Sequence, residues 1–237
     1  MKRDYFISVA MATFNGEKYI KEQLESILCQ LTKEDEIIIS DDGSKDNTIK
    51  IIKSLKDKRI KIINGPQNGV KQNFANAISS CNGKYIFLAD QDDIWKDKKV
   101  EKVLHAFEKE KCLCVVHDAK VFDSDSNEII MDSFYEFRNS KSGIIKNIIK
   151  NSYIGCCMAF DSCIKNKILP IPNDIEMHDQ WIGIMCEKYG KSIFINDKLV
   201  LYRRHGNNVS DMKHYPLMKM VMNRLIFIIK IMKGADY

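Results

Sequence analysis

Four short apolar segments, separated by segments with the periodicity of helices, limit what this chain can fold into. The apolar segments have the length of strands and lie at residues 6–12, 36–40, 59–63 and 85–89. Apolar residues at helical spacing follow each of them, at residues 17–31, 48–55, 71–81 and 96–110. Strands that alternate with helices predict βαβ units and a mostly parallel sheet. Right-handed crossovers then place helices on both faces of that sheet.

Polar motifs follow three of these strands, at the point where each strand ends. They are TFNG at 13–16, DDGS at 41–44 and DQDD at 90–93. The carboxyl ends of parallel strands share one edge of a sheet, and open α/β sheets bind ligands in the crevice at that edge. The sequence therefore predicts that the three motifs converge on one crevice.

The stretch Tyr85–Trp95, with the sequence YIFLADQDDIW, carries three carboxylates in four residues. Asp90, Asp92 and Asp93 repel one another unless a positive charge lies among them. Mg²⁺ and similar hard cations take carboxylate oxygens together with water and substrate phosphates. We therefore expect a divalent metal here, with Trp95 as a pocket wall or a core residue. A solvated acidic turn is the alternative, because short motifs also occur by chance.

The second half of the chain is less regular, with strands expected at 113–117, 120–122, 153–160, 192–195 and 199–202. Asp179 would lie near the start of a helix that ends at about Tyr189, where the helix dipole favours the carboxylate form. An ionised Asp in a cleft can act as a general base. A capping role at the helix N-terminus is the alternative.

A polar loop after the last of these strands carries Arg203, Arg204 and His205. Two arginines and a histidine suit a diphosphate, and a neutral imidazole can also ligate a metal. A solvated basic turn explains the same residues equally well.

The C-terminal segment predicts an amphipathic helix from Pro216 to about Lys233, without any acidic residue between residues 212 and 235. Lys219, Asn223, Lys230 and Lys233 fall on one arc of this helix, and apolar residues fill most of the rest. Helices of this kind lie in membrane interfaces. Docking on the protein body or on a partner subunit is the competing interpretation.

Bulk composition fits one α/β domain, alone or with an appendage, since the 237 residues are 45% hydrophobic and 29% charged. The net charge of +5 is modest and lies largely near the C-terminus, without a basic RNA-binding or zinc-finger pattern, so we expect no nucleic-acid partner. The eight cysteines follow no recognisable secretory leader, and we expect buried, reduced thiols in a cytoplasmic protein. No apolar run reaches the roughly 20 residues that span a bilayer.

Taken together in this order, the motifs resemble those of family 2 glycosyltransferases with the GT-A fold, and most of all the bacterial rhamnosyltransferase-like branch. The resemblance covers about residues 5–210. It rests on TFNG at 13–16, YIKEQLESIL at 19–28, DDGS at 41–44, NGVKQNF at 68–74, DQDDIW at 90–95, HDQW at 178–181 and YRRHGNN at 202–208. It implies a catalytic domain at 1–210, divided into a nucleotide-binding half at 1–110 and an acceptor-binding half at 111–210. Residues 211–237 form the amphipathic helix with possible membrane association.

The activity that this resemblance implies is transfer of one sugar, with inversion, from a nucleotide-diphosphate donor such as dTDP-rhamnose or a UDP-hexose. The acceptor would be a hydroxyl of a lipid-linked or cell-surface glycan precursor, and the enzyme would lie peripherally on the inner face of the cell membrane. A homo-oligomer is possible.

Individual roles also follow from the resemblance. Asp179 matches the catalytic base, and Asp92 matches the ligand of Mg²⁺ or Mn²⁺, with His205 near the metal or diphosphate. The residues expected to bind the nucleotide sugar are Thr13, Asn15, Asp42, Asn73, Asp90, Arg203 and Arg204.

Two departures from the family pattern affect this expectation. His178 stands where many relatives carry a glutamate before the catalytic aspartate, which affects the acceptor pocket or the pKa of Asp179. The QxxRW motif of processive synthases is missing, which favours transfer of a single sugar.

Two other functions compete with this one. A non-catalytic nucleotide-sugar-binding subunit of a glycan assembly complex would not need all three of Asp90, Asp92 and Asp179. A sugar-1-phosphate nucleotidyltransferase needs a glycine-rich N-terminal loop with a following Arg and Lys, and TFNGEKY does not provide it.

Overall fold

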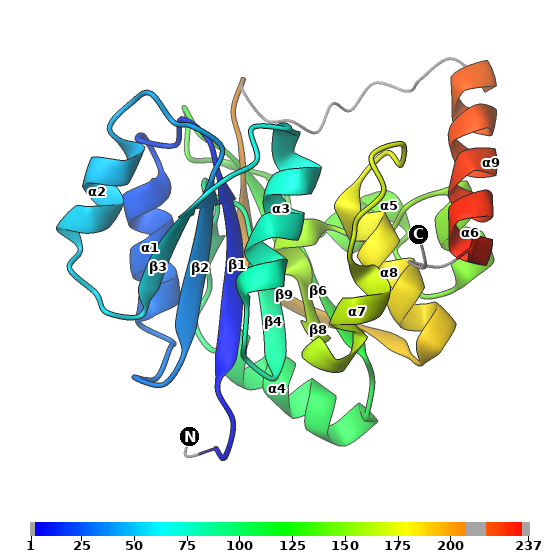
Figure 1. The fold of residues 1–237 in the computed structure, drawn as a ribbon, viewed down its shortest axis with the longest axis horizontal. Coiled ribbons are helices and arrows are strands. Elements are labelled where there is room, and N and C mark those ends of the chain that lie inside the picture. The colour runs from blue at the N-terminus through cyan, green and yellow to red at the C-terminus, as the bar shows by residue number, and fades with distance from the viewer. Residues whose placement is uncertain (1–2, 207–216, 234–237) are drawn as a thin grey trace.

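The fold is a mixed α/β arrangement around one nine-stranded sheet, seen in a computed structural model that describes residues 3–206 and 217–233 (Figure 1). The strands are β1 (Ile7–Thr13), β2 (Glu36–Asp41), β3 (Ile60–Asn64), β4 (Tyr85–Ala89), β5 (Ile94–Trp95), β6 (Cys114–Asp123), β7 (Ile129–Met131), β8 (Met158–Asp161) and β9 (Ser192–Arg204). Their order across the sheet is β3-β2-β1-β4-β8-β6-β9-β5, and β7 pairs with β6.

The α-helices are α1 (Ile20–Leu28), α2 (Thr48–Ser54), α3 (Gly69–Ser80), α4 (Lys99–Glu110), α5 (Phe134–Arg138), α6 (Ile144–Ile149), α7 (Lys165–Ile168), α8 (His178–Tyr189) and α9 (Leu217–Lys233). Two short 3₁₀ turns, η1 (Gly155–Cys157) and η2 (Ser162–Ile164), flank β8. Figure 1 shows α3 in front of β1 and β4, with α7 and α8 beside it and α9 at the far right.

The first four strands form the parallel block that the alternating pattern predicts. β1 pairs in parallel with β2 and with β4, and β2 pairs in parallel with β3. Every residue of β1, β2 and β4 is buried, as expected of parallel strands covered on both faces. The apolar runs were therefore correctly interpreted as strands.

The rest of the sheet is mixed. β8 is antiparallel to both β4 and β6, while β6 and β9 run parallel. The strands expected at 113–117 and 120–122 are one strand, β6, and those expected at 192–195 and 199–202 are also one, β9. The register moves from His117 opposite Ile195 to Asp118 opposite Lys198. Asn196 and Asp197 thus form an irregularity within one continuous strand, where the sequence predicted a gap between two strands.

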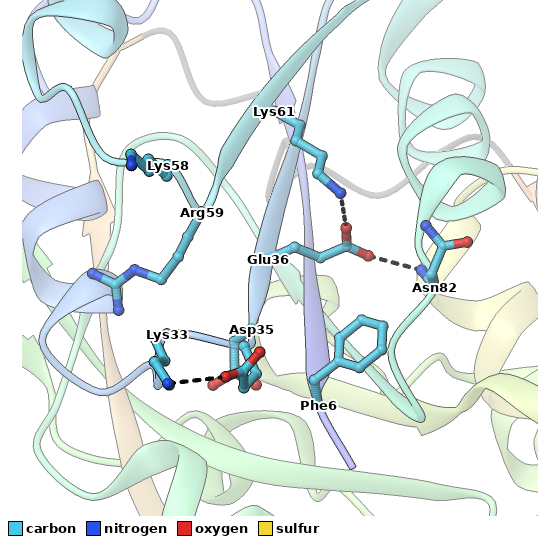
Figure 2. Close-up of a pocket in the computed structure, with 9 residues that line it drawn as sticks. Phe6, Lys33, Asp35, Glu36, Lys58, Arg59, Lys61 and Asn82 are labelled. Atoms are coloured by element: carbon cyan, nitrogen blue, oxygen red, sulfur yellow. Dashed lines mark hydrogen bonds and ion pairs between the residues drawn. The ribbon is translucent and has the colours of Figure 1, made fainter.

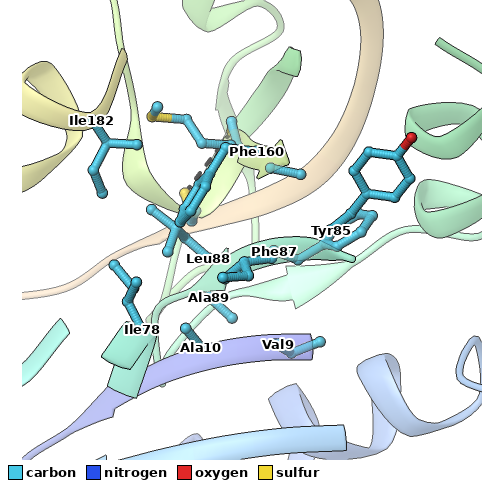
Figure 3. Packing of buried hydrophobic residues seen from close by; sticks show 14 of the residues in the cluster. Val9, Ala10, Ile78, Tyr85, Phe87, Leu88, Ala89, Phe160 and Ile182 are labelled. Carbon is cyan, nitrogen blue, oxygen red and sulfur yellow. Dashed lines mark hydrogen bonds between the residues drawn. The ribbon is translucent and has the colours of Figure 1, made fainter. Parts of the chain in front are cut away.

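A single apolar core joins the two parts of the sheet, and Figure 3 shows its centre. Val9 of β1 and Phe87 of β4 lie opposite each other in register, and Ala159 of β8 faces Phe87 from the other side. Ile182 of α8 and Ile78 of α3 are both completely buried in the same cluster. The second half of the chain is therefore packed directly on the parallel block.

The C-terminal helix α9 lies on the protein body. Phe227 is 3% exposed and packs edge-on against Trp181 of α8, with ring centroids 6.0 Å apart. Lys230 pairs with Asp174 at 3.0 Å, and Asn223 donates a hydrogen bond to Glu176 at 3.4 Å. The competing interpretation of this segment, docking on the body, therefore describes one side of the helix. Pro216 and the side chains of Lys219 and Lys233 lie outside the described residues.

None of the helices in the described ranges is both long enough and apolar enough to cross a bilayer.

Candidate functional site

The three polar motifs meet at the carboxyl edge of β1, β2 and β4, as predicted. The Gln91 side chain accepts a hydrogen bond from the Phe14 N–H at 3.0 Å and donates one to the Phe14 carbonyl at 3.1 Å. The Asn15 N–H donates to Ser44 Oγ at 2.8 Å. These contacts join TFNG to DQDD and to DDGS, so the motifs form one edge of a common site.

The residues predicted to hold the nucleotide differ in exposure. Asp42 accepts hydrogen bonds from the backbone N–H groups of Gln67 at 2.6 Å and Gly69 at 3.1 Å, which fixes the loop before α3. Asn15 has a left-handed backbone with φ of 49° and is exposed, and its side-chain oxygen accepts from the Lys45 N–H at 2.9 Å. Both residues lie at the rim, where a ligand can reach them.

Thr13 and Asn73 lie deeper. The Thr13 hydroxyl donates to Asp41 at 3.0 Å, and the Asn73 amide donates to the Thr13 carbonyl at 3.2 Å. The side-chain oxygen of Asn73 is buried without a hydrogen-bond partner among the described residues. A Cβ on Gly65 would lie 2.6 Å from that oxygen and 2.8 Å from Asp42. Only glycine fits at this position without displacing the two side chains.

Carboxylates crowd at the end of β4. Ligand atoms of Asp90, Asp93 and Cys156 all lie within 4.8 Å of one another. Burial and the neighbouring charges of Asp93, Asp92 and Asp179 raise the pKa of Asp90 well above its usual range. Burial and the charge of Asp92 raise the pKa of Asp93 to about 7. The predicted repulsion among these acids is therefore present in the folded chain.

Asp92 points to the loop that follows β9. Its Oδ2 lies 2.8 Å from His205 Nε2, and the His205 ring stacks on Tyr19 with centroids 5.0 Å apart. The structure thus brings together the two residues that were predicted to ligate the metal, although they are separated by more than a hundred positions in the chain.

Arg203 is built into the protein around this pair. Its side chain donates to the Asp92 carbonyl at 2.7 Å and to Glu22 at 2.5 Å, and its backbone N–H donates to Asp93 at 3.0 Å. The guanidinium lies 4.6 Å from the ring centroids of both Tyr19 and Phe122. With 5% of its surface exposed, Arg203 holds the acidic segment against α1 and β6. Arg204, the other predicted diphosphate ligand, is partly exposed beside it.

The chemistry of this group of residues fits a divalent cation. Asp93 Oδ2 is buried and has no hydrogen-bond partner among the described residues, and a cation would relieve the repulsion between the acids. Asp92 with His205 offers oxygen and imidazole ligands, whereas Asp90 and Asp93 share their set with a thiol. Mg²⁺ and Mn²⁺ prefer oxygen ligands over thiolates, so Asp92 with His205 suits the predicted metal better than the set that includes the thiol.

A buried lysine lies behind the acids. Lys99 at the start of α4 has no exposed surface, donates to the Cys156 carbonyl at 2.7 Å and lies 4.0 Å from the centroid of the Trp95 ring. Burial lowers its pKa to about 8, while the nearby Cys157, Cys156 and Asp93 act in the opposite direction. Trp95 is 3% exposed and belongs to the core, which is one of the two places predicted for it.

The predicted base lies in the first turn of α8. Asp179 is 7% exposed, and its Oδ1 accepts hydrogen bonds from the Gln180 N–H at 2.6 Å and from Asn151 at 3.3 Å. Burial raises the pKa of Asp179 to about 6, against the lowering effect of these hydrogen bonds. The capping position of α8 is Met177, so the alternative role of Asp179 as the N-cap is wrong.

The turn η1 separates the base from the acids. Its residue Cys156 approaches Asp90 and Asp93, while a Cβ on Gly155 would lie 3.9 Å from Asp179 Cβ. The charge of Asp179 also contributes to the raised pKa of Asp90. The predicted strand at 153–160 is a strand only from Met158 onward, because this turn enters the site.

His178, the departure from the family pattern, lies beside the base. Its ring stacks on Phe74 with centroids 4.2 Å apart, and it is 3% exposed. Burial lowers the pKa of His178 to about 3, so the ring is neutral near pH 7. Neither ring nitrogen has a hydrogen-bond partner among the described residues.

Several residues of the site were not predicted. Tyr19, Glu22 and Gln23 of the first helical segment contact Arg203, His205 or the Asp90 carbonyl, which accepts from Gln23 at 2.7 Å. Gln23 is a polar residue at a buried position of α1, next to Leu24, but the sequence alone does not distinguish it from the exposed polar residues of the same helix. The sequence carried no signal for Lys99 or Cys156, because their roles depend on contacts between distant parts of the fold.

A depression at the opposite edge of the sheet does not compete with this site. Figure 2 shows it at the amino ends of the strands, where charges are paired within the protein. Lys61 meets Glu36 at 2.7 Å, and Glu36 also accepts from the Asn82 N–H at 2.8 Å. The first contact links β2 to β3, and the second holds the connection between α3 and β4 on β2, so both serve the fold.

Comparison with known proteins agrees with the geometry. The family model described as Glycosyl transferase family 2 matches residues 8–169. The dTDP-rhamnosyl transferase RfbG of Shigella flexneri is 30% identical, over 84% of this chain and 72% of RfbG. The UDP-Glc:alpha-D-GlcNAc-diphosphoundecaprenol beta-1,3-glucosyltransferase WfgD of Escherichia coli is 25% identical, over 99% of this chain and 97% of WfgD.

Among solved structures, S. aureus TarS 1–349 in complex with UDP-GlcNAc matches 98% of this chain and 67% of its own, with a TM-score of 0.75 and 15% identity. This likeness shows the fold, which is GT-A. The chain spans 66% of the length of another relative, the uncharacterized glycosyltransferase alr2836 of Nostoc sp.. Because the family model covers more than half of its residues, the chain belongs to glycosyl transferase family 2 and is a glycosyltransferase that acts on nucleotide sugars in glycan biosynthesis.

Proposed function

We propose that this glycosyltransferase moves one sugar, with inversion and with the help of Mg²⁺ or Mn²⁺, from a nucleotide diphosphate to a hydroxyl group of a glycan precursor. The sugar donor is dTDP-rhamnose or a UDP-hexose, and the acceptor is lipid-linked or on the cell surface. The observation that carries this proposal is the position of Asp179, a buried carboxylate with a raised pKa, across the turn η1 from the acidic end of β4.

In this proposal residues 1–110 bind the nucleotide and residues 111–210 shape the acceptor side. Asn15 and Asp42 at the rim, with Thr13 and Asn73 below them, form the end that receives the nucleobase and ribose. Asp90 lies at the ribose or diphosphate. Arg204 adds positive charge at the diphosphate, while Arg203 orients Asp92 and Asp93.

Asp92 and His205 would hold the metal. When bound, the cation neutralises the charge that grows on the departing diphosphate.

The transfer itself needs one base. Asp179 as a carboxylate removes the proton of the acceptor hydroxyl, whose oxygen bonds to the anomeric carbon on the face opposite the diphosphate. The bond from that carbon to the diphosphate oxygen breaks, and its electron pair leaves with the nucleoside diphosphate. A base whose pKa is about 6 is ionised near neutral pH and is still basic enough to accept the proton.

The same proposal places the enzyme at the inner face of the cell membrane, where a lipid-linked acceptor would be found. WfgD, whose name specifies a diphosphoundecaprenol acceptor, matches over 99% of this chain, which supports a lipid-linked acceptor.

The first test is thermal stabilisation by a panel of nucleotides and nucleotide sugars, with and without Mn²⁺. A ligand that binds only the folded protein stabilises it by about 2.7 kcal/mol at 100-fold over its Kd. We expect one donor to raise the melting temperature in the presence of metal, and chelation to remove most of the shift. Absence of any shift across the panel would contradict the donor site. Detection of transfer or donor hydrolysis excludes the non-catalytic subunit.

A further inference from the structure

The outer side of α9 is an apolar stripe with no covering among the described residues. Its members recur at three- and four-residue spacing and fall within an arc of roughly 120° on a helical wheel. Each of these side chains is between 38% and 79% exposed. The stripe consists of Met218, Val221, Met222, Leu225, Ile228, Ile229 and Met232. A surface helix of a soluble protein normally presents polar side chains on its outer side. The apolar stripe therefore indicates that another molecule covers this side of α9.

The direction of the stripe is fixed by contacts on the other side of the helix. Phe227, at the centre of that side, packs on Trp181, and Lys188 of α8 donates to the Ile231 carbonyl at 2.6 Å. The Asn223 and Lys230 contacts with the segment before α8 complete the attachment. The polar arc of the helix is thus partly used to hold α9 on the protein body, and the apolar arc faces outward.

Helix α6 extends the apolar surface. Ile145 is 76% exposed and Ile149 is 59% exposed, at a spacing of one helical turn. Arg224 of α9 donates two hydrogen bonds to the Ile149 carbonyl, at 3.1 and 2.5 Å, so the two helices are in direct contact. Figure 1 shows α6 beside the lower end of α9. We refer to the exposed apolar residues of these two helices as the α6–α9 face.

The segments that form this face are basic. Residues 137–160, which contain α6, include four Lys or Arg and no acid, and residues 212–235, which contain α9, include five and no acid. Lys141, Lys150 and Lys188 are exposed around the face. An apolar stripe with cationic flanks is the pattern of a helix that lies in an anionic membrane interface.

We propose that the α6–α9 face docks this enzyme on an anionic lipid bilayer. Charge complementarity favours the bilayer over a second copy of the chain, because a symmetric dimer would bring two copies of the basic α6 and α9 segments together, while Asp174 and Glu176 beside α9 already contact Lys230 and Asn223. Phosphatidylglycerol-type headgroups satisfy the lysines, and the acyl boundary receives Leu225, Ile229 and their neighbours.

The docking also orients the site. Helix α9 is attached to α8 through Trp181, and α8 carries Asp179 two residues before that tryptophan. The helix that holds the proposed base is therefore connected to the bilayer through a single layer of packing. This consequence rests on the proposed function, because it takes the acceptor to be lipid-linked, whereas the docking itself does not depend on it.

Sedimentation with vesicles tests the face. The full chain is mixed with vesicles of phosphatidylcholine alone, or with about one third phosphatidylglycerol, at low and at high salt. We expect binding to the anionic vesicles that weakens as salt rises, because the Debye length falls from about 10 Å at 0.1 M to about 3 Å at 1 M. The double variant Leu225→Glu/Ile229→Glu should bind about tenfold or more weakly, since it removes two apolar anchors and adds two repelled charges.

The matched control is Ile129→Glu/Ile130→Glu on β7, a strand that is not part of the α6–α9 face, where the two side chains are 48% and 57% exposed. It should bind vesicles as the parent does. Donor-induced thermal stabilisation of all three proteins checks the fold and the donor site separately from docking.

Three outcomes overturn the proposal. The parent chain fails to bind anionic vesicles at low salt, or the α9 variant binds them as well as the parent does. The third outcome is that the parent is a dimer by light scattering, the α9 variant is a monomer, and neither protein binds vesicles. That result assigns the face to contact with a second copy of the chain. Loss of the donor-induced shift in every protein would instead contradict the proposed function and leave the docking result standing.

Discussion

The parallel block of β1 to β4 and the mixed part of the sheet contribute to the site in different ways. In the parallel block, three motifs follow directly from three neighbouring strands and are connected by short hydrogen bonds such as that from Asn15 to Ser44. In the mixed part, Asp179 comes from a helix start and Arg203 from the end of the 13-residue strand β9. The proposed donor side is thus positioned largely by local chain geometry, whereas Asp179 and Arg203 reach the site through tertiary packing.

Two neighbouring residues near the N-terminus of α8 have different contacts. Asp179 is held by Gln180 and Asn151. Two residues later, Trp181 packs against Phe227 of α9. A change on α9 can therefore reach the acceptor side without touching any strand of the parallel block, and substitutions can distinguish the two parts.

The largest expected effect is on turnover in Asp179→Asn. Loss of a general base lowers kcat by about 10²–10⁴, while the sugar donor should bind with nearly unchanged Kd because its predicted contacts lie in the parallel block. Steady-state kinetics and calorimetric titration of the donor measure the two quantities. Asp174→Asn, an acid in the segment before α8 that pairs with Lys230, is the control and should keep kcat. Normal turnover in Asp179→Asn would show that Asp179 is not the general base.

Phe227→Ala should lower the stability of the acceptor side. Truncation of a buried aromatic costs about 3 kcal/mol or more when it leaves a cavity, and here the cavity would lie between α9 and Trp181. Hydrogen exchange should show loss of protection in α9 and α8 with little change in β1, β2 and β4. Uniform loss of protection across the parallel block would show that the two regions are not separable.

Asp92→Asn compared with Cys156→Ser sharpens the metal assignment. If Asp92 and His205 hold the cation, Asp92→Asn should weaken Mn²⁺ binding at least about tenfold, and Cys156→Ser should leave it within about twofold. Titration of Mn²⁺ followed by electron paramagnetic resonance measures both. The reverse order would place the cation at Asp90, Asp93 and Cys156.

A smaller effect concerns stability and pH. The pKa of Asp179 is raised to about 6 from 3.8, so the folded state binds a proton more tightly than the unfolded state does. Its ionisation therefore destabilises the fold above about pH 6, and this effect disappears as pH falls below about 4. The free energy of unfolding of Asp179→Asn should be about 1–2 kcal/mol higher at pH 8 than that of the parent. This gain is smaller than a shift of two full pKa units allows, because the substitution also loses hydrogen bonds. Denaturant titrations at pH 8 and pH 4 measure the gain, which should be absent at pH 4.

Much of the donor side could be predicted because its information is local. Each of β1, β2 and β4 is followed at once by its polar motif, so the apolar run and the motif lie within about ten residues of each other in the chain. The residues alone indicated a metal among the acids of 90–93 and an imidazole at His205 able to ligate one, and the family resemblance then assigned Asp92 as the metal ligand with His205 near it. Asp93 was seen as part of the acidic stretch, but its contact with the backbone of Arg203 was not.

The acceptor side was predicted less well for a physical reason. Whether Asn196-Asp197 ends a strand or bulges within it depends on pairing with β6, and the side of α9 that docks depends on where Trp181 lies. Lys99 looked like any surface lysine of an amphipathic helix, and only the fold shows that it is buried beside Trp95. Such features are set by contacts between distant segments.

The length of β9 has a consequence of its own. The strand begins at Ser192, whose hydroxyl donates to the Gly183 carbonyl of α8 at 3.3 Å, and it ends at Arg203 and Arg204 in the site. Side chains alternate between the two faces of a strand, so deletion of one residue after Lys198 would turn Arg203 away from Tyr19 and Phe122. The number of residues in β9 therefore determines how Arg203 is placed relative to α8 and to the acidic segment at 90–93. A change in that number would disable the site even when every side chain in it is intact.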